Sequence, residues 1–179
     1  TPLIEKAGEL KASLHPMKAA MFSIIHARAK KLLLRNGGYM LPPGLASSEA
    51  VLATAEQFPK KDRFGSIVVS CGSGTITAGL LIEAECPVIA VSCGMSVTAQ
   101  LGRIKRLIDV TTPLSAWKIG NLELITTKYS YWDKEESDCP FPCNEYYDRK
   151  AWSWLQDNYS RLPTPILFWN VGGNCLPVH

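Results

Sequence analysis

The strongest fold signal in this chain is the stretch Val68-Val69-Ser70-Cys71-Gly72-Ser73-Gly74-Thr75-Ile76-Thr77-Ala78-Gly79. It begins in an apolar run rich in β-branched residues (residues 65–70), which is typical of a strand buried on both faces. Glycines at 72 and 74 indicate a turn, and an apolar helix is expected from about Ile76 to Glu83. The stretch therefore predicts a strand, a glycine turn and a helix in direct succession.

The same alternation of strands and helices continues on both sides of this stretch. Further strands are expected at residues 10–14, 87–91, 122–126 and 165–169, and further helices from Thr1-Pro2 and at 17–35, 47–57, 96–107 and 148–159. Strands that alternate with helices indicate β-α-β units and parallel pairing. We therefore predict an α/β fold with a mainly parallel, twisted sheet and helices on both faces.

The composition is that of an ordinary globular protein. Of the 179 residues, 46% are hydrophobic and 20% are charged, which excludes a collagen-like or disordered chain. The net charge is +3, and no basic run of five or more residues occurs, so a nucleic-acid partner is not expected. The longest apolar stretch, around residues 67–69, is far shorter than the roughly 20 residues that a membrane span needs. Charged residues also occupy the start of the chain, where a signal peptide would be apolar.

The cysteines do not form a recognisable metal-binding pattern. Cys139 and Cys143 bracket Pro-Phe-Pro, but no second pair repeats this spacing, and the three histidines are scattered. Zinc sites normally combine two such pairs. We therefore expect no metal site, free thiols and a location in the reducing cytoplasm.

The glycine turn after residue 71 suits a bound phosphate. Glycines allow close backbone approach, hydroxyl groups add donors, and the free amides at a helix start attract an anion. The turn lacks the lysine of a P-loop and the glycine spacing of a dinucleotide-binding fingerprint. The alternative is a tight strand-to-helix turn whose glycines serve geometry alone.

Three stretches together resemble a known enzyme family. They are Ala27-Arg28-Ala29-Lys30-Lys31-Leu32 with Gly38-Tyr39-Met40-Leu41-Pro42-Pro43-Gly44, then residues 66–79, then Tyr146-Tyr147-Asp148-Arg149-Lys150-Ala151-Trp152 with Ile166-Leu167-Phe168-Trp169-Asn170-Val171-Gly172-Gly173. Their order resembles the second half of the fold type II, tryptophan-synthase-β-like, pyridoxal-phosphate enzymes. The most similar branch contains D-cysteine desulfhydrase and aminocyclopropanecarboxylate deaminase.

The resemblance implies a cofactor site for pyridoxal 5'-phosphate. It implies that residues 1–45 are the tail of the smaller subdomain, and that residues 46–179 form the subdomain with the phosphate cup. The implied cofactor-binding residues are Gly72, Ser73, Gly74, Thr75, Ile76, Thr77, Asn170, Val171 and Gly172. Two positions depart from the family pattern: Thr75 replaces a second glycine, and Val171 replaces the hydroxyl residue that faces the ring nitrogen, a role left to Asn170.

No segment of the chain resembles the one that carries the family's imine-forming lysine. Lys6, Lys11 and Lys18 precede the match in amphipathic surroundings, and Lys150 is expected to be structural or exposed. The chain is therefore interpreted as a fragment, as one half of a split enzyme, or as a lineage that lost the lysine chemistry. It begins with Thr1 rather than Met, and a missing N-terminal half or second chain is an expected partner.

Two functions follow as hypotheses. The first is a pyridoxal-phosphate enzyme that eliminates, replaces or deaminates a group on an amino acid or amino-acid adduct, and is a homo-oligomer when complete. The second is a lysine-free module or partner subunit that binds a phosphate or nucleotide without catalysis. In either case residues 128–145 form a loop in which Tyr129, Tyr131 and Trp132 are candidate substrate or partner contacts.

Overall fold

The computed structural model describes residues 2–112 and 116–172. It divides into two compact units, Thr1–Leu41 and Pro42–His179. The first unit contains helices α1 (Pro2–Glu9) and α2 (Phe22–Asn36). The strand predicted at residues 10–14 is wrong, because these residues form a turn and irregular chain. Leu10 and Leu14 are 72% and 53% exposed, so this segment has no sheet neighbour against which to bury an apolar face.

The second unit is built on a four-stranded parallel sheet in the order β3-β2-β1-β4. Its strands are β1 (Ser66–Cys71), β2 (Val88–Ser92), β3 (Leu122–Ile125) and β4 (Ile166–Trp169). Val69 in the central strand pairs with Ala90 on one side and with Trp169 on the other. Because every strand runs in the same direction, all four carboxyl ends lie along one edge of the sheet, where ligands bind in open α/β folds.

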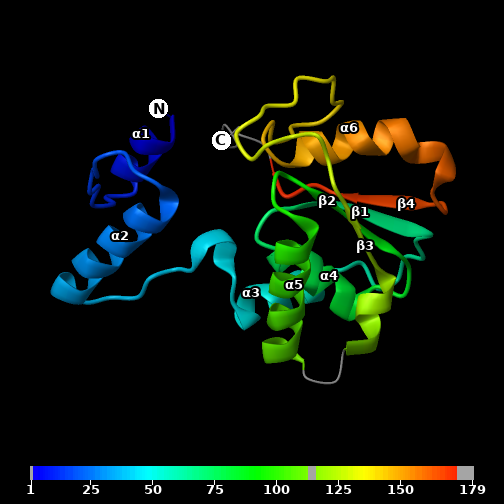
Figure 1. Cartoon of the computed structure of the whole chain (residues 1–179), viewed down its shortest axis with the longest axis horizontal. Coiled ribbons are helices and arrows are strands. Elements are labelled where there is room, and N and C mark those ends of the chain that lie inside the picture. Colours follow the sequence, from blue (N-terminus) through cyan, green and yellow to red (C-terminus); the bar gives the residue numbers. More distant parts are fainter. Residues whose placement is uncertain (1, 113–115, 173–179) are drawn as a thin grey trace. The chain divides into compact units, whose positions relative to one another are not determined.

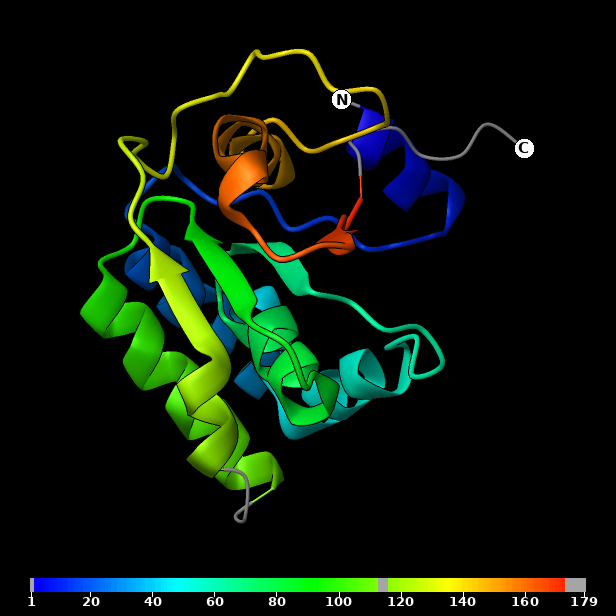
Figure 2. The same cartoon turned by 90° about the vertical axis from the view of Figure 1, so that its right-hand side faces the viewer.

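Helices cover both faces of this sheet, as predicted (Figures 1 and 2). One face carries α3 (Ser48–Glu56), α4 (Thr75–Glu83) and α5 (Val97–Thr111), and the other carries α6 (Asp148–Asn158). Short 3-10 turns occur at Pro43–Leu45, Ala116–Asn121 and Tyr159–Arg161. Apart from the missing strand and the later start of α2, the predicted elements form within a few residues of their expected ends.

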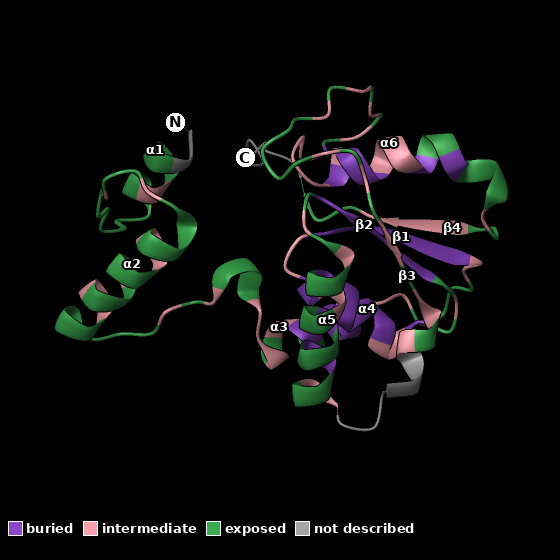
Figure 3. Cartoon of the chain, viewed as in Figure 1, coloured by how far each residue is buried: buried purple, intermediate pink, exposed green. Residues whose placement is uncertain are grey.

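Two hydrophobic cores lie back to back across the sheet. Side chains alternate between the faces of a strand, so Ile67 and Val69 pack toward Leu80 and Ile104, whereas Val68 packs toward Leu155. The two central strands are entirely buried, and so are six of the nine residues of α4 (Figure 3). None of the helices in the described ranges is both long enough and apolar enough to cross a bilayer.

Candidate functional site

The glycine turn lies at the carboxyl edge of the sheet, between β1 and α4. Gly74 caps the helix with φ +87°, and a Cβ atom there would lie 2.8 Å from Cγ1 of Ile104. Both the left-handed backbone and the contact with α5 therefore require glycine at this position. The structure thus shows that Gly74 is needed for the geometry of the turn, as the sequence suggested for the glycines of this stretch.

The same turn carries a cluster of unused backbone donors. Within the described residues, the amides of Gly72, Ser73, Gly74, Ile76 and Thr77 donate no hydrogen bond. The amide of Thr75 makes only a long contact of 3.4 Å to Oγ of Ser73. Free amides at the start of a helix combine with the helix dipole to attract an anion. The turn therefore has the donor set of a phosphate site.

A second segment packs directly onto this turn. The carbonyl oxygen of Gly44 accepts hydrogen bonds from Oγ of Ser73 at 3.0 Å and from Oγ1 of Thr75 at 2.9 Å. Gly44 has φ +65°, and a Cβ atom on it would lie 2.4 Å from Cβ of Ser73. The proline-glycine loop and the glycine turn, 29 residues apart in the chain, thus share one side of the site.

The predicted phosphate-binding residues differ in what they expose. Ser73 is half-buried and its hydroxyl lies among the polar groups of the turn. Thr77 is 1% exposed and its hydroxyl lies toward Cys71, where it opposes the rise in thiol pKa that burial causes. Ile76 offers an apolar, half-buried side chain. At Ile76 and Thr77, the groups available to a phosphate are therefore the backbone amides.

Asp148, the first residue of α6, is a buried carboxylate at the same edge of the sheet. It is 1% exposed, and its Oδ1 atom accepts a hydrogen bond of 2.5 Å from Oγ of Ser70. Burial raises the pKa of Asp148, while Ser70 and the amides of Val171 and Gly172 oppose the rise. The carboxylate thus joins the end of β1 to the segment after β4. Sequence reasoning quoted this aspartate within a helix but assigned it no role.

The segment after β4 is held by Asn170. Nδ2 of Asn170 donates to the carbonyl oxygen of Pro142 at 2.8 Å, and its Oδ1 accepts from the amide of Gly172 at 3.3 Å. Both polar ends of this side chain are therefore engaged within the protein. Val171 is 55% exposed, and Gly173 lies outside the described residues.

Aromatic residues close the other side of the glycine turn. The ring of Tyr147 lies so near Gly72 that a Cβ atom there would be 3.3 Å from its Cε1. The hydroxyl of Tyr147 is hydrogen-bonded to that of Tyr131. Burial is the main cause that raises the pKa of Tyr147. This pair ties the 128–145 segment to the turn, whereas Trp132, also predicted as a contact, is 79% exposed.

Lys150 is a buried residue that contacts the 128–145 segment. Its side chain is fully buried, its Nζ atom donates to the carbonyl oxygen of Ser130 at 2.9 Å, and the same atom lies 5.3 Å from the ring centroid of Tyr129. Burial lowers the pKa of this lysine. Lys150 therefore anchors the 128–145 segment from beneath, and its buried position excludes the solvated-surface interpretation.

The chain is similar in sequence to one curated enzyme and in structure to one solved enzyme homologue. The chain is 32% identical over 184 residues to a "Glycyl-dTMP PLP-dependent decarboxylase" of Pseudomonas phage M6, and the match covers 94% of this chain and 65% of the phage protein. It also superimposes on the crystal structure of an ACC deaminase homologue with a TM-score of 0.69 and 22% identity, over 96% of this chain and 61% of that one. No family model matches the chain.

These matches confirm both the α/β fold and the resemblance to the fold type II pyridoxal-phosphate enzymes. This chain spans less than two thirds of the length of either protein, so the activity of a whole enzyme is not carried over with the fold.

Proposed function

From this kinship with the fold type II enzymes, we propose that the chain supplies the phosphate cup of a pyridoxal-phosphate-dependent enzyme. Its substrate is an amino acid or an amino-acid adduct, and the reaction occurs at the amino acid's α-carbon. The observation that carries the proposal is the cluster of free amides between β1 and α4. The imine-forming lysine lies in the remaining part of a complete protein or in a second chain, and the complete enzyme is a cytoplasmic homo-oligomer.

The described residues fit the phosphate group of the cofactor. The amides at 72–74, 76 and 77 provide donors without any side-chain charge, and Ser73 and Thr75 add two hydroxyls. These hydroxyls donate to Gly44 in the structure, so phosphate binding redirects them from the carbonyl oxygen to the ligand. Hydrogen bonds to an anion are stronger than those to a neutral carbonyl, which favours this exchange.

Pyridoxal phosphate, when bound, supplies an electron sink for charge that develops at the substrate α-carbon. The protein's part is to hold and orient the ring and to exclude water. Asp148 is a buried carboxylate at this edge, and its hydrogen bonds to Ser70 and to the amides of Val171 and Gly172 hold the segment after β4 beside the site. The side chain of Asn170, which the sequence assigned to the ring nitrogen, is likewise engaged within the protein. Tyr147 and Tyr131 form the wall beside the turn.

The substrate class is narrowed by the phage relative. The name of that protein gives glycyl-dTMP as its substrate, an amino acid joined to a nucleotide. An adduct of this kind lies within the class proposed above. We therefore propose that the substrate carries a nucleotide, and that the bond broken at the α-carbon is the one to a carboxylate.

A binding experiment tests the cup. The purified chain is titrated with pyridoxal phosphate and with pyridoxal, which lacks the phosphate, and binding is followed by absorbance. We expect inorganic phosphate to compete with pyridoxal phosphate, and pyridoxal to bind at least about tenfold more weakly. The double variant Ser73→Ala/Thr75→Ala should weaken the cofactor's binding, whereas Thr111→Ala, which removes a hydroxyl on α5, should not. Equal binding of the two compounds would contradict the proposal.

Reduction of the mixture with borohydride tests whether this chain forms the imine by itself. If no single lysine is modified while the cofactor binds, it does not, and the enzyme proposal then needs a lysine from elsewhere. One dominant modified lysine would show that this chain forms the imine by itself. The second candidate is a non-catalytic phosphate-binding module, and the engagement of Lys150 in a structural contact is compatible with it as well as with the first. It predicts that adding the rest of a complete protein produces no imine.

A further inference from the structure

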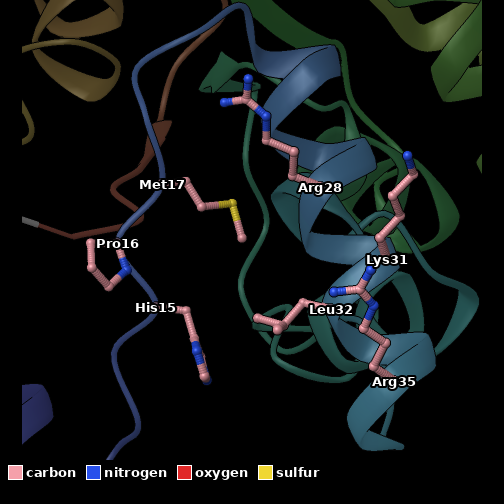
Figure 4. Close-up of a pocket in the computed structure, with 7 residues that line it drawn as sticks. All are labelled: His15, Pro16, Met17, Arg28, Lys31, Leu32 and Arg35. Atoms are coloured by element: carbon pink, nitrogen blue, oxygen red, sulfur yellow. The ribbon is translucent and has the colours of Figure 1, made fainter.

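A separate hollow lies within the unit Thr1–Leu41, between α2 and the chain that precedes it (Figure 4). Its volume is about 380 Å³, and it is lined by His15, Pro16, Met17, Arg28, Lys31, Leu32 and Arg35. Pockets for small molecules in proteins occupy about 300 to 1,000 Å³. The hollow is therefore large enough for a nucleotide-sized ligand.

The helical wall of the hollow is strongly basic. Arg28, Lys31 and Arg35 are spaced by three and four residues, which places them along one side of α2. None of the three forms a salt bridge within the described residues. The only acidic residues among positions 1–41 are Glu5 and Glu9, and Glu9 is paired with Lys6 at 2.8 Å. Among the described residues, neither glutamate forms a salt bridge with Arg28, Lys31 or Arg35.

One of these cations is fixed in place. Nη1 of Arg28 donates to the carbonyl oxygen of Lys18 at 2.8 Å, which ties the helix to the segment that precedes it. Figure 4 shows the side chains of Met17 and Leu32 lying between Arg28 and His15. Pro16, Met17 and Leu32 provide apolar surface beside the charges. A ligand with an anionic end and a flat apolar part matches both halves of this lining.

We propose that this hollow binds a nucleoside monophosphate. Arg28, Lys31 and Arg35 bind the phosphate, and the base lies against Met17 and Leu32. Arginine suits this role because its guanidinium group pairs with phosphate through two hydrogen bonds. The binding of a nucleotide in the hollow does not depend on the proposed function. Only its purpose does: the nucleotide bound there would be the nucleotide portion of the amino-acid adduct that serves as substrate. The residues that line the hollow all belong to the first unit, whereas those of the proposed phosphate cup belong to the second.

The test uses the full chain, saturated with pyridoxal phosphate so that the cup is occupied. Calorimetric titration compares dTMP with thymidine, with inorganic phosphate and with a single-stranded oligonucleotide. We expect dTMP to bind at least about tenfold more tightly than thymidine, because thymidine lacks the charge-assisted contacts. We also expect it to bind more tightly than inorganic phosphate, because phosphate gains nothing from the apolar lining.

Matched variants locate the site. Lys31→Gln/Arg35→Gln should weaken dTMP binding about tenfold or more. The control Lys30→Gln/Lys105→Gln removes the same net charge from exposed positions outside the hollow and should change binding less than about twofold. Met17→Ala should weaken dTMP but leave inorganic phosphate unchanged. Ser73→Ala/Thr75→Ala should leave dTMP binding intact.

Three results would overturn the inference. They are equal weakening by the two double variants, equal affinity for dTMP and inorganic phosphate, and binding of the oligonucleotide without binding of dTMP. The last result would identify the hollow as part of a nucleic-acid surface. Failure of the proposed function is recognised separately. Suppose that dTMP binds and that the variants change its affinity as expected, while pyridoxal phosphate does not bind. The nucleotide site in the hollow would then be supported, and the phosphate-cup proposal would be contradicted.

Discussion

The two faces of the sheet are built from the same strands but with different chemistry. Toward α3, α4 and α5 the core is almost purely aliphatic, with Ile67, Val69, Leu80 and Ile104 fully buried. Toward α6, the aliphatic core is smaller, and the carboxylate of Asp148 and the ammonium of Lys150 are buried as well. Burying charge opposes folding, whereas burying aliphatic side chains drives it. The first face therefore stabilises the unit, and the second holds ionisable groups at the site.

The largest expected difference between the faces is in core truncation. Leu80→Ala should lower the free energy of unfolding by about 2–5 kcal/mol, because Leu80 is fully enclosed in the aliphatic core. Leu155→Ala, on the α6 face, should fall at the lower end of that range, since Leu155 retains 4% exposure and a smaller core surrounds it. Urea unfolding of both variants measures the difference. A larger loss for Leu155→Ala would reverse the assignment of the stabilising face.

Glycine substitutions sharpen the comparison within the first face. Gly74→Ala should destabilise the protein by about 1–3 kcal/mol, since it adds a positive-φ penalty and a close contact with Ile104. It should also weaken pyridoxal phosphate binding. The control is Gly102→Ala within α5, where an added Cβ meets no atom within 4 Å. That variant should stabilise by about 1 kcal/mol through helix propensity. Equal effects in thermal unfolding would contradict the constraint at Gly74.

The buried Asp148 on the α6 face should make the stability of the protein depend on pH. Because burial raises the pKa of Asp148 above 3.8, the folded protein binds this proton more tightly than the unfolded chain. The resulting stability is present below pH 3.8 and is lost as the pH rises through the raised pKa. Asp148→Asn removes this loss, which amounts to about 1.4 kcal/mol for each unit of pKa difference.

Urea unfolding at a series of pH values from about 3 to about 8 measures how the contribution of Asp148 to stability changes with pH. The stability of Asp148→Asn relative to the unmodified chain should rise across the window. Asp157→Asn, an exposed position on the same helix, serves as the control and should show no such trend. A relative stability that falls with rising pH would mean that the hydrogen bonds to Asp148 outweigh its burial.

The smallest expected effect concerns the tyrosine pair at the edge of the second face. Tyr147→Phe removes the hydrogen bond to Tyr131 and should lower stability by about 0.5–1.5 kcal/mol. It should also speed amide hydrogen exchange in residues 128–145, which this pair helps to hold. Tyr159→Phe, at a position 58% exposed, should leave exchange in that segment unchanged. Unchanged exchange in Tyr147→Phe would assign the anchoring to the other contacts of this segment, such as those of Lys150 and Asn170.

The strands and the glycine turn could be predicted because their signals are local. Residues 65–70 and 87–91 are short β-branched runs next to turn residues, and the structure confirms the buried parallel strands that they indicate. The predicted strand at 10–14 failed because a strand needs a neighbour, which a local pattern does not report. The division of the chain at residue 45 and the individual cofactor contacts stay predictions.

The role of Asp148 could not be predicted because it depends on contacts distant in sequence. Its partner Ser70 lies 78 residues earlier in the chain, and its burial follows from the packing of α6 across the strand ends. The same limit applies to Lys150, which was interpreted as structural or exposed. An aspartate at a helix start is usually a solvated cap, so the sequence offered no sign that this one is enclosed.

The proposed phosphate cup takes most of its donors from the main chain, and this affects how the protein could diverge. Every residue except proline carries the same amide, so a point substitution rarely deletes a donor and acts on the cup mainly by crowding it. A substitution of Ser73 or Thr75 would thus remove a hydroxyl donor but leave the amide donors of the turn in place. A cup of this kind can outlast the chemistry it first served and be inherited by a new reaction.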